Sequence, residues 1–205
     1  MTVVTCPTFP YTVPAANTTA LITAVTCANN NATNDTINLN NSTYTLTTAD
    51  NATDGGNGLP VIVDAATAGT LTINGNGATI ARSSAGGTAE FRILKSPAAA
   101  IWLSTGRSLQ MGIHPIPAVL SIMQAGRSRL ATARFPSNSA LTVGTGSAIE
   151  NGGMLTVINT TFSTNLAVGG GALDNIGTAV VINNTFANNT ASFGGAIDNY
   201  GGALR

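Results

Sequence analysis

Apolar and polar residues alternate along the last third of the chain, and this alternation predicts short β-strands. Within the segment 154–159, Leu155, Val157 and Asn159 fall on one face, and the residues between them fall on the other. A helix would repeat its apolar positions every 3.6 residues instead. The glycines and asparagines between such segments suit sharp corners, because both residue types tolerate a positive φ. The pattern therefore predicts three short strands in each repeat, joined by corners.

The strand pattern recurs at a fixed interval of 24 residues. The hexapeptide 146–151 returns as 170–175 and again as 194–199, and the segment 161–165 returns as 185–189. A fixed period of this size is typical of a solenoid, in which each turn buries its apolar face only by stacking on its neighbours. Because the repeats consist of strands, the predicted fold class is all-β: a right-handed parallel β-helix with 24-residue coils.

Stacking at this interval places equivalent residues above one another. In the first hexapeptide, Ile149 and Asn151 would face inward, and Glu150 between them would face outward. Three interior columns are predicted: Ile149, Leu173 and Ile197; Asn151, Asn175 and Asn199; and Phe162 over Phe186. The asparagine amides are expected to hydrogen-bond along their column at roughly the 4.8 Å spacing of neighbouring strands.

The N-terminal part predicts a cap followed by the first coils. After a lead segment, residues 1–14, the stretch 17–28 has the pattern of one short amphipathic α-helix that begins at hydroxyl and amide side chains. Laid across the first coil, this helix would cover the apolar interior of that coil. Alternating segments within 35–47 and 71–80 predict the opening coils, so the cap and these coils together extend over residues 15–95.

The composition agrees with such a fold and excludes several functions. Of 205 residues, 8% are charged and 5% are aromatic, and the net charge is zero. A disordered chain would be more charged or richer in proline. The sequence has no stripe of basic residues, which nucleic-acid binding requires. No apolar run approaches the roughly 20 residues of a transmembrane helix.

The repeats resemble those of a known family. Gly-Gly-Ala-Leu at 170–173 followed by Phe-x-x-Asn at 186–189 is similar to the paired repeat of polymorphic outer-membrane proteins and related bacterial β-helix surface proteins. The resemblance extends over roughly residues 15–95 and 137–205. It implies a non-enzymatic exported scaffold, adhesin-like and located at the cell surface or outside the cell, whose partner is a polysaccharide or a protein on a cell surface.

A second class of function is also compatible with this fold. Parallel β-helices of the pectate-lyase-like type include carbohydrate-active enzymes, both polysaccharide lyases and glycoside hydrolases, so the fold alone does not select between scaffold and enzyme. No catalytic residue and no organic cofactor is predicted from the sequence.

Three acidic side chains form the one candidate for a metal site or a catalytic pair. Glu150, Asp174 and Asp198 are 24 residues apart and are expected to stack on the outer face, about one strand spacing from each other. Carboxylates this close repel one another, so they favour a bound cation, with calcium as the candidate ion. A separation of about 5 Å would also suit a retaining glycosidase pair. The simpler interpretation is that a column of acids keeps an exposed strand soluble.

Residues 96–136 interrupt the pattern on either side. They contain the only tryptophan, Trp102, the only histidine, His114, and no acid. Four of the eight basic residues are also here: Arg107, Arg127, Arg129 and Arg134. One interpretation is a functional insertion, such as a basic loop.

The favoured interpretation of residues 96–136 is that the right gene is read in the wrong frame. With suitable codons, a shift of one base turns 118–124 into Gly-Gly-Ala-Ile-Tyr-Asn-Ala and 127–136 into Thr-Leu-Thr-Val-Ser-Asn-Ser-Thr-Phe-Ser, which parallels residues 154–163. This hypothesis predicts an irregular segment that interrupts the core. Sequencing the gene tests the frame-shift hypothesis, and codons incompatible with the shift would contradict it.

The ends of the sequence predict a fragment of a longer protein. The family that the chain resembles is exported, yet no apolar segment follows Met1 and the first basic residue is Arg82, so no signal peptide is visible. Residues 203–205 are expected to lie in the strand that 179–181 forms one coil earlier. The last coil would then present an open edge, which favours edge-to-edge self-association.

Cys6 and Cys27 are the only cysteines. They are either two buried or incidental thiols or the two halves of a disulfide in an exported protein. The sequence leaves both interpretations open.

Overall fold

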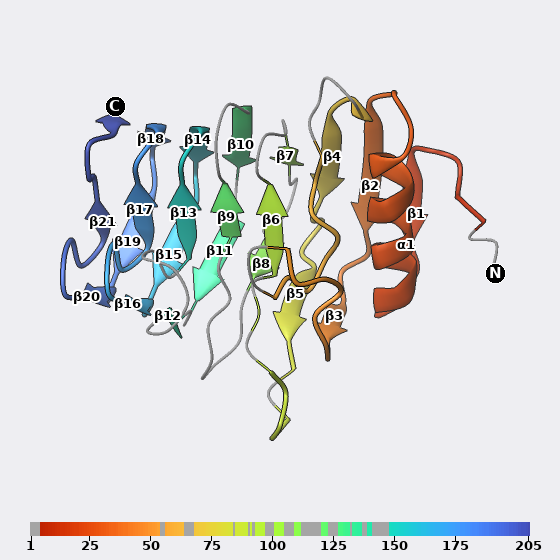
Figure 1. The fold of residues 1–205 in the computed structure, drawn as a ribbon, viewed down its shortest axis with the longest axis horizontal. Helices are drawn as coiled ribbons and strands as arrows, with labels where there is room; N and C mark the ends of the chain where they lie inside the picture. The colour runs from red at the N-terminus through yellow and green to blue at the C-terminus, as the bar shows by residue number, and fades with distance from the viewer. Residues whose placement is uncertain are drawn as a thin grey trace.

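The chain winds into coils that stack along one axis. The computed structural model describes residues 5–53, 56–63, 68–83, 85–89, 91, 93–96, 101–104, 109–111, 120–122, 127–131, 133–136, 139–140 and 148–205. Within them, parallel sheets wind into a β-helix of about 5 turns, as predicted (Figure 1). Helix α1 (Thr18–Asn29) lies across the N-terminal end of the stack, and the C-terminal coil lies at the other end.

The described strands form four sheets, each of which collects strands from successive coils. The 8-stranded sheet contains β1 (Tyr11–Val13), β2 (Asp35–Leu39), β4 (Leu71–Asn74), β7 (Ile101–Ser104), β10 (Arg127–Ala131), β14 (Met154–Ile158), β18 (Thr178–Ile182) and β22 (Ala203–Leu204). The 6-stranded sheet contains β3 (Thr43–Leu46), β5 (Thr79–Arg82), β8 (Leu109–Met111), β11 (Ala133–Pro136), β15 (Thr161–Ser163) and β19 (Thr185–Ala187). The 5-stranded sheet contains β6 (Leu94–Ser96), β9 (Leu120–Ile122), β13 (Ile149–Asn151), β17 (Leu173–Asn175) and β21 (Ile197–Asp198). The 3-stranded sheet contains β12 (Ser139–Ala140), β16 (Leu166–Ala167) and β20 (Thr190–Ala191).

The coil that begins at Ile149 contains four strands, β13 to β16, and not the three that were predicted. The additional strand, β16, has only two residues, Leu166 and Ala167, and it pairs with β12 on one side and β20 on the other. Two residues are too few to show an alternation of apolar and polar positions, so the sequence pattern did not reveal this side of the coil.

Coil length is not constant along the chain. Asp35 pairs with Leu71, 36 residues later, whereas Met154 pairs with Thr178, 24 residues later. The 24-residue coil is therefore confirmed for the last third of the chain and is wrong for the first coils. The additional residues of the longer coil are not all surface loop, because Leu59 is buried among them and belongs to the hydrophobic core.

The alternation in β14 supplies the hydrophobic interior of the last coils. Leu155 and Val157 are buried, as predicted, and their neighbours along the strand are more exposed. Asn159 does not continue this inward face, because it has a φ of 51° and forms an exposed corner before β15. Its Oδ1 accepts a hydrogen bond of 2.7 Å from Nδ2 of Asn183, the equivalent corner in the next coil.

The phenylalanine column forms and is longer than predicted. The rings of Phe162 and Phe186 stack with their centroids 4.9 Å apart and their planes at 6°. Phe135 extends the column on the other side of Phe162, at 5.0 Å and 9°. The middle ring is fully buried, so both of its faces contact aromatic neighbours.

The two columns predicted on the neighbouring sheet are also present. They consist of Ile149, Leu173 and Ile197, and of Asn151, Asn175 and Asn199. Nδ2 of Asn151 donates a hydrogen bond of 2.6 Å to Oδ1 of Asn175, whose own Nδ2 donates to Oδ1 of Asn199 at the same distance. These bonds satisfy polar atoms that would otherwise be costly to bury.

The glycine pair of the repeat is explained by close backbone packing. A Cβ atom on Gly170 would collide with the carbonyl group of Leu173, within the same coil. A Cβ atom on Gly171 would collide with the carbonyl oxygen of Gly195, in the next coil. The Gly-Gly at 170–171 is therefore required by the winding and stacking of the backbone, although the preceding copy of the repeat has Ser147 at the second position.

Helix α1 caps the stack, as predicted. Oδ1 of Asn17 accepts a hydrogen bond of 2.9 Å from the backbone N–H of Ala20, which is the arrangement of an N-cap. The side chains on the buried face of the helix are Leu21, Ala24, Val25, Cys27 and Ala28. Most of them join the same hydrophobic core as the first coils.

Cys6 and Cys27 form a disulfide, which decides the question that the sequence left open. The bond joins the lead segment to α1 across a sequence separation of 21 residues. Between the two cysteines, β1 pairs in parallel with β2 of the first coil. The lead segment, the helix and the first coil are thus linked at the N-terminal end of the stack.

Residues 96–136 are not irregular where the structure describes them. β7 and β10 continue the 8-stranded sheet, β8 and β11 continue the 6-stranded sheet, and β9 lies between β6 and β13. The prediction of an irregular segment is wrong for these strands. Arg127 lies opposite Met154 and Phe135 opposite Phe162, which is the alignment that the shifted reading frame also gives. The frame shift itself stays a prediction.

The last strand pairs one position away from its predicted register. Ala203 lies opposite Thr178, and Leu204 lies opposite Ala179, whereas the 24-residue interval had placed Ala203 opposite Ala179. The last turn is therefore slightly longer than the repeat that precedes it.

Candidate functional site

The three carboxylates of the predicted acidic column are neighbours in the 5-stranded sheet. Glu150 on β13 lies opposite Asp174 on β17, which lies opposite Asp198 on β21. Strand alternation places them on the face opposite the buried isoleucine, leucine and asparagine columns. The predicted register of the acids is therefore confirmed.

The exposure of these acids differs from the prediction. Asp174 is only 3% exposed, whereas Glu150 and Asp198 are half-buried. The expectation of a fully solvent-facing column is thus wrong for Asp174, which lies between Glu150 and Asp198 and so has a neighbouring side chain on both sides. Across the described ranges, no three aspartate, glutamate, histidine or cysteine side chains come together as a group that could hold a metal ion.

A groove lies beside these carboxylates on the last two coils, and we call it the aromatic groove. Its volume is about 210 Å³, and it is lined by Val168, Gly169, Asp174, Ile176, Phe193, Asp198 and Tyr200. The two aspartates are the only charged side chains in this lining.

The aromatic groove arises from differences between equivalent positions of the repeat. Phe193 occupies the position that Gly169 has one coil earlier, so a bulky ring stands beside a position with no side chain. Tyr200 likewise occupies the position that Ile176 has one coil earlier and that Gly152 has two coils earlier. The groove is therefore produced by a few side chains on a regular backbone, not by an additional segment.

The apolar walls of the groove are largely exposed. Ile176, Phe193 and Tyr200 are 52%, 66% and 78% exposed. Large apolar side chains gathered in this way on a surface mark an interaction site more often than a structural feature. Together with two carboxylates, they suit a ligand that has an apolar part and a positive charge or several hydrogen-bond donors.

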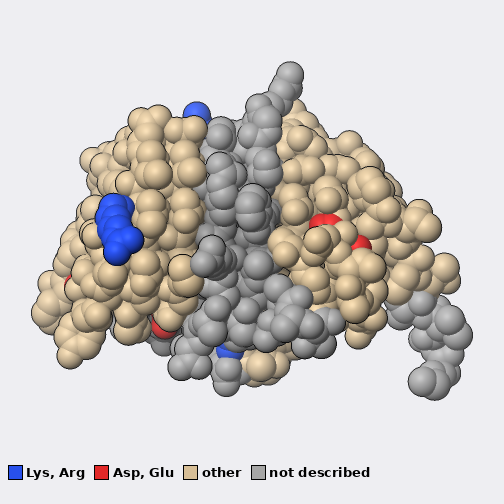
Figure 2. Space-filling model, turned by 90° about the horizontal axis from the view of Figure 1, so that it is seen from above, with Lys and Arg blue, Asp and Glu red and all other residues tan. Residues whose placement is uncertain are grey.

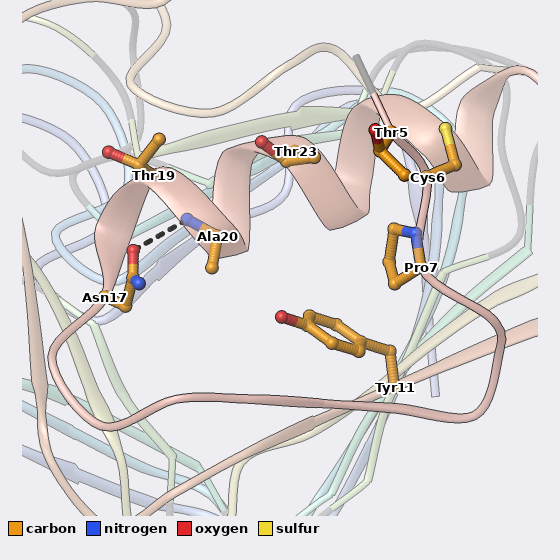
Figure 3. A pocket seen from close by; sticks show the side chains of 8 residues that line it. All are labelled: Thr5, Cys6, Pro7, Tyr11, Asn17, Thr19, Ala20 and Thr23. Carbon is orange, nitrogen blue, oxygen red and sulfur yellow. Dashed lines mark hydrogen bonds between the residues drawn. The ribbon is translucent and has the colours of Figure 1, made fainter.

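A second cavity, of about 420 Å³, lies between the lead segment and α1 (Figure 3). Tyr11 extends into it from the side opposite the helix, and Asn17 and Thr19 lie at the first turn of α1. The side chain of Asn17 already serves as the N-cap, and the lining contains hydroxyl groups but no charged residue. Its position inside the disulfide-linked cap indicates a structural role.

Two buried cations that the sequence did not single out also have structural roles. Nη1 of Arg82 donates hydrogen bonds of 2.6 Å to the carbonyl oxygens of Thr88 and Ala89, and so closes the loop after β5. Nζ of Lys95 on β6 donates to the carbonyl oxygen of Thr53 at 3.4 Å. Both groups bind backbone carbonyls of their own chain and lie away from the aromatic groove.

The other residues that the sequence singled out are not among the described residues that line the groove. His114 and Arg107 lie outside the described residues. Trp102 lies in β7, and Arg127 and Arg129 lie in β10. Arg134 on β11 is exposed. The sequence reasoning missed Val168, Ile176, Phe193 and Tyr200; the signal available was the replacement of Gly169 by Phe193 one repeat later.

Charged side chains are sparse on the described surface. Figure 2 shows one face of the molecule, on which blue and red atoms form only isolated patches among the tan ones. Within residues 148–205, the acids are Glu150, Asp174 and Asp198, and the one base is Arg205. The coils that carry the aromatic groove are therefore net negative.

Comparisons of the chain with protein-family models, with curated proteins and with solved structures find no match. In the part of the chain that the structure describes, no helix has the length and apolar character needed to span a bilayer. The assignment of function therefore depends on the geometry of the coils and of the groove.

Proposed function

We propose that this protein is a non-enzymatic, exported β-helix scaffold that binds a partner at a cell surface, in the manner of an adhesin. The observation that carries the proposal is the aromatic groove, where exposed apolar side chains of two successive coils form a recognition surface on a rigid stack. A preformed surface of this kind loses little conformational entropy when it binds.

Export is supported by the disulfide between Cys6 and Cys27. Disulfides persist in oxidising compartments and are rare in the cytosol. The resemblance of the repeats to those of bacterial outer-membrane surface proteins is consistent with the same location. The low content of charged residues, 8%, suits a face whose hydrogen bonds come from neutral threonine and asparagine side chains.

A carbohydrate-active enzyme is the second candidate, and the specific observation in its favour is the register of the acids. Asp174 lies directly between Glu150 and Asp198 on adjacent strands, so carboxylates are neighbours, and a glycosidase needs such a pair of carboxyl groups. The burial of Asp174 favours the scaffold over the enzyme, because a buried carboxylate is poorly placed to reach a polymer.

Binding without turnover is the expected behaviour. Labelled protein incubated with a panel of polysaccharides and with intact bacterial and epithelial cells should bind a subset of them, while reducing ends and unsaturated uronic-acid products stay at the level of the buffer, with or without calcium. The measurement is retention on the surface alongside a colorimetric and an ultraviolet assay of the soluble fraction. Calcium-dependent release of products that Asp174→Asn abolishes would instead establish the enzyme.

A further inference from the structure

We propose that the aromatic groove binds one basic side chain, a lysine or an arginine, presented by a protein partner. The inference deepens the proposed scaffold function and depends on it, because it names the partner chemistry of the same surface. It draws on the shape of the groove, on the charge of its lining and on the arrangement of its aromatic rings.

The size of the groove matches one long side chain. A volume of about 210 Å³ is below the range of roughly 300–1,000 Å³ usual for sites of drug-sized ligands. It is large enough for a methylene stem and its terminal charged group. The stem would lie against Val168 and Ile176, which line the groove and present aliphatic carbon.

Charge complementarity selects a cation as the occupant. Asp174 and Asp198 line the groove from adjacent strands, and no basic residue is part of the lining. Asp174 is almost fully buried, so it offers little surface that an incoming group could reach. Asp198 is half-buried, so it is the carboxylate that an incoming ammonium or guanidinium group can approach.

The aromatic side chains add a second attraction for the same group. Phe193 and Tyr200 both line the groove, and each leaves most of its surface exposed. A cation over the face of either ring interacts favourably with the negative quadrupole of the ring. Lysine and arginine combine an apolar stem with a terminal charge, and therefore suit a lining of aliphatic, aromatic and carboxylate groups.

The test uses two capped pentapeptides on the full-length protein: acetyl-Gly-Ser-Lys-Ser-Gly-amide and its twin with norleucine in place of lysine. Norleucine keeps the methylene stem and removes the charge. Titration is followed by NMR, at the amide signals of 168–176 and 193–200. We expect the lysine peptide to bind about tenfold more tightly than the norleucine peptide, and the preference to shrink at high salt, as for a charged ligand.

Variants assign the binding to the groove. Asp198→Asn keeps the shape of the side chain and should weaken binding of the lysine peptide about tenfold, and Tyr200→Ser should weaken it about three- to tenfold. Both positions are at least partly exposed, so these changes leave the core intact. Asp50→Asn, which removes an exposed carboxylate in the first coil, is the matched control and should bind like the wild type.

Equal affinity for the two peptides, or binding that Asp198→Asn leaves unchanged, would overturn the assignment of a cation. Binding of a neutral oligosaccharide at the same amide signals, in preference to the lysine peptide, would overturn it as well. If neither peptide binds while the protein still binds cells without turnover, only this inference is contradicted. If polysaccharide turnover appears, the scaffold function is lost independently.

Discussion

Replacing Phe162 with alanine is expected to lower the free energy of unfolding by about 3–5 kcal/mol, the range measured for buried phenylalanines truncated to alanine. Phe162 is fully buried, and its ring lies between those of Phe135 and Phe186 at 5.0 and 4.9 Å. The change opens a cavity in the middle of the column and removes both stacking contacts, which contribute beyond the buried area. Urea unfolding followed by circular dichroism measures the loss.

The coils in which Phe162→Ala lowers stability can be identified, in addition to the total loss of free energy. Because each coil contacts only its neighbours, the loss should be concentrated in the coils on either side of β15, and hydrogen exchange should accelerate there before it does in the first coils. Phe193→Ala is the control, since this ring is exposed, and its effect should stay within about 0.5 kcal/mol. Equal effects of the two variants would contradict the packing described for the column.

Replacing both cysteines with serine is expected to destabilise the N-terminal cap by about 3 kcal/mol, the value for a closed loop of this length. The disulfide joins Cys6 to Cys27 across 21 residues, and without it the unfolded lead segment gains conformational freedom. The lead segment and α1 should then open at a lower urea concentration than the last coils. Limited proteolysis between β1 and α1, together with thermal unfolding, measures the change.

A reducing agent supplies the internal control for the disulfide. Reduction should lower the stability of the wild type to that of the double serine variant, and it should not affect the variant. If the wild type is equally stable with and without reductant, the bond does not hold the cap. A cap that opens while the last coils stay folded would show that the two ends of the stack unfold separately, as nearest-neighbour coupling predicts.

The sequence was sufficient to predict the last coils because their columns repeat at one interval. The asparagine and phenylalanine columns, the N-cap at Asn17 and the parallel stacking follow from local chemistry and a constant period. Where the period changes, prediction fails. The coil between Asp35 and Leu71 has 36 residues, and no constant interval could align the two residues from sequence alone.

The candidate site was less predictable than the fold, for a physical reason. The register of Asp174 follows from the repeat, but the groove beside it is also lined by Gly169 and Phe193, which lie outside the strand that carries Asp174. No strand pairing links these positions to Asp174. The sequence pattern therefore locates the carboxylate but not the side chains that line the groove with it.

The close approach of Gly171 to Gly195 has a consequence for how this chain can lengthen. Since successive coils meet through the same backbone contacts, recombination between two copies of the glycine pair would add or delete one complete coil and keep every column in register. The molecule would grow in steps of roughly 4.8 Å, one strand spacing at a time. Insertion of a single residue within a strand would instead turn the inward side chains of that strand outward. Relatives are therefore expected to differ by whole coils or by residues added between strands, as in the last turn of this chain.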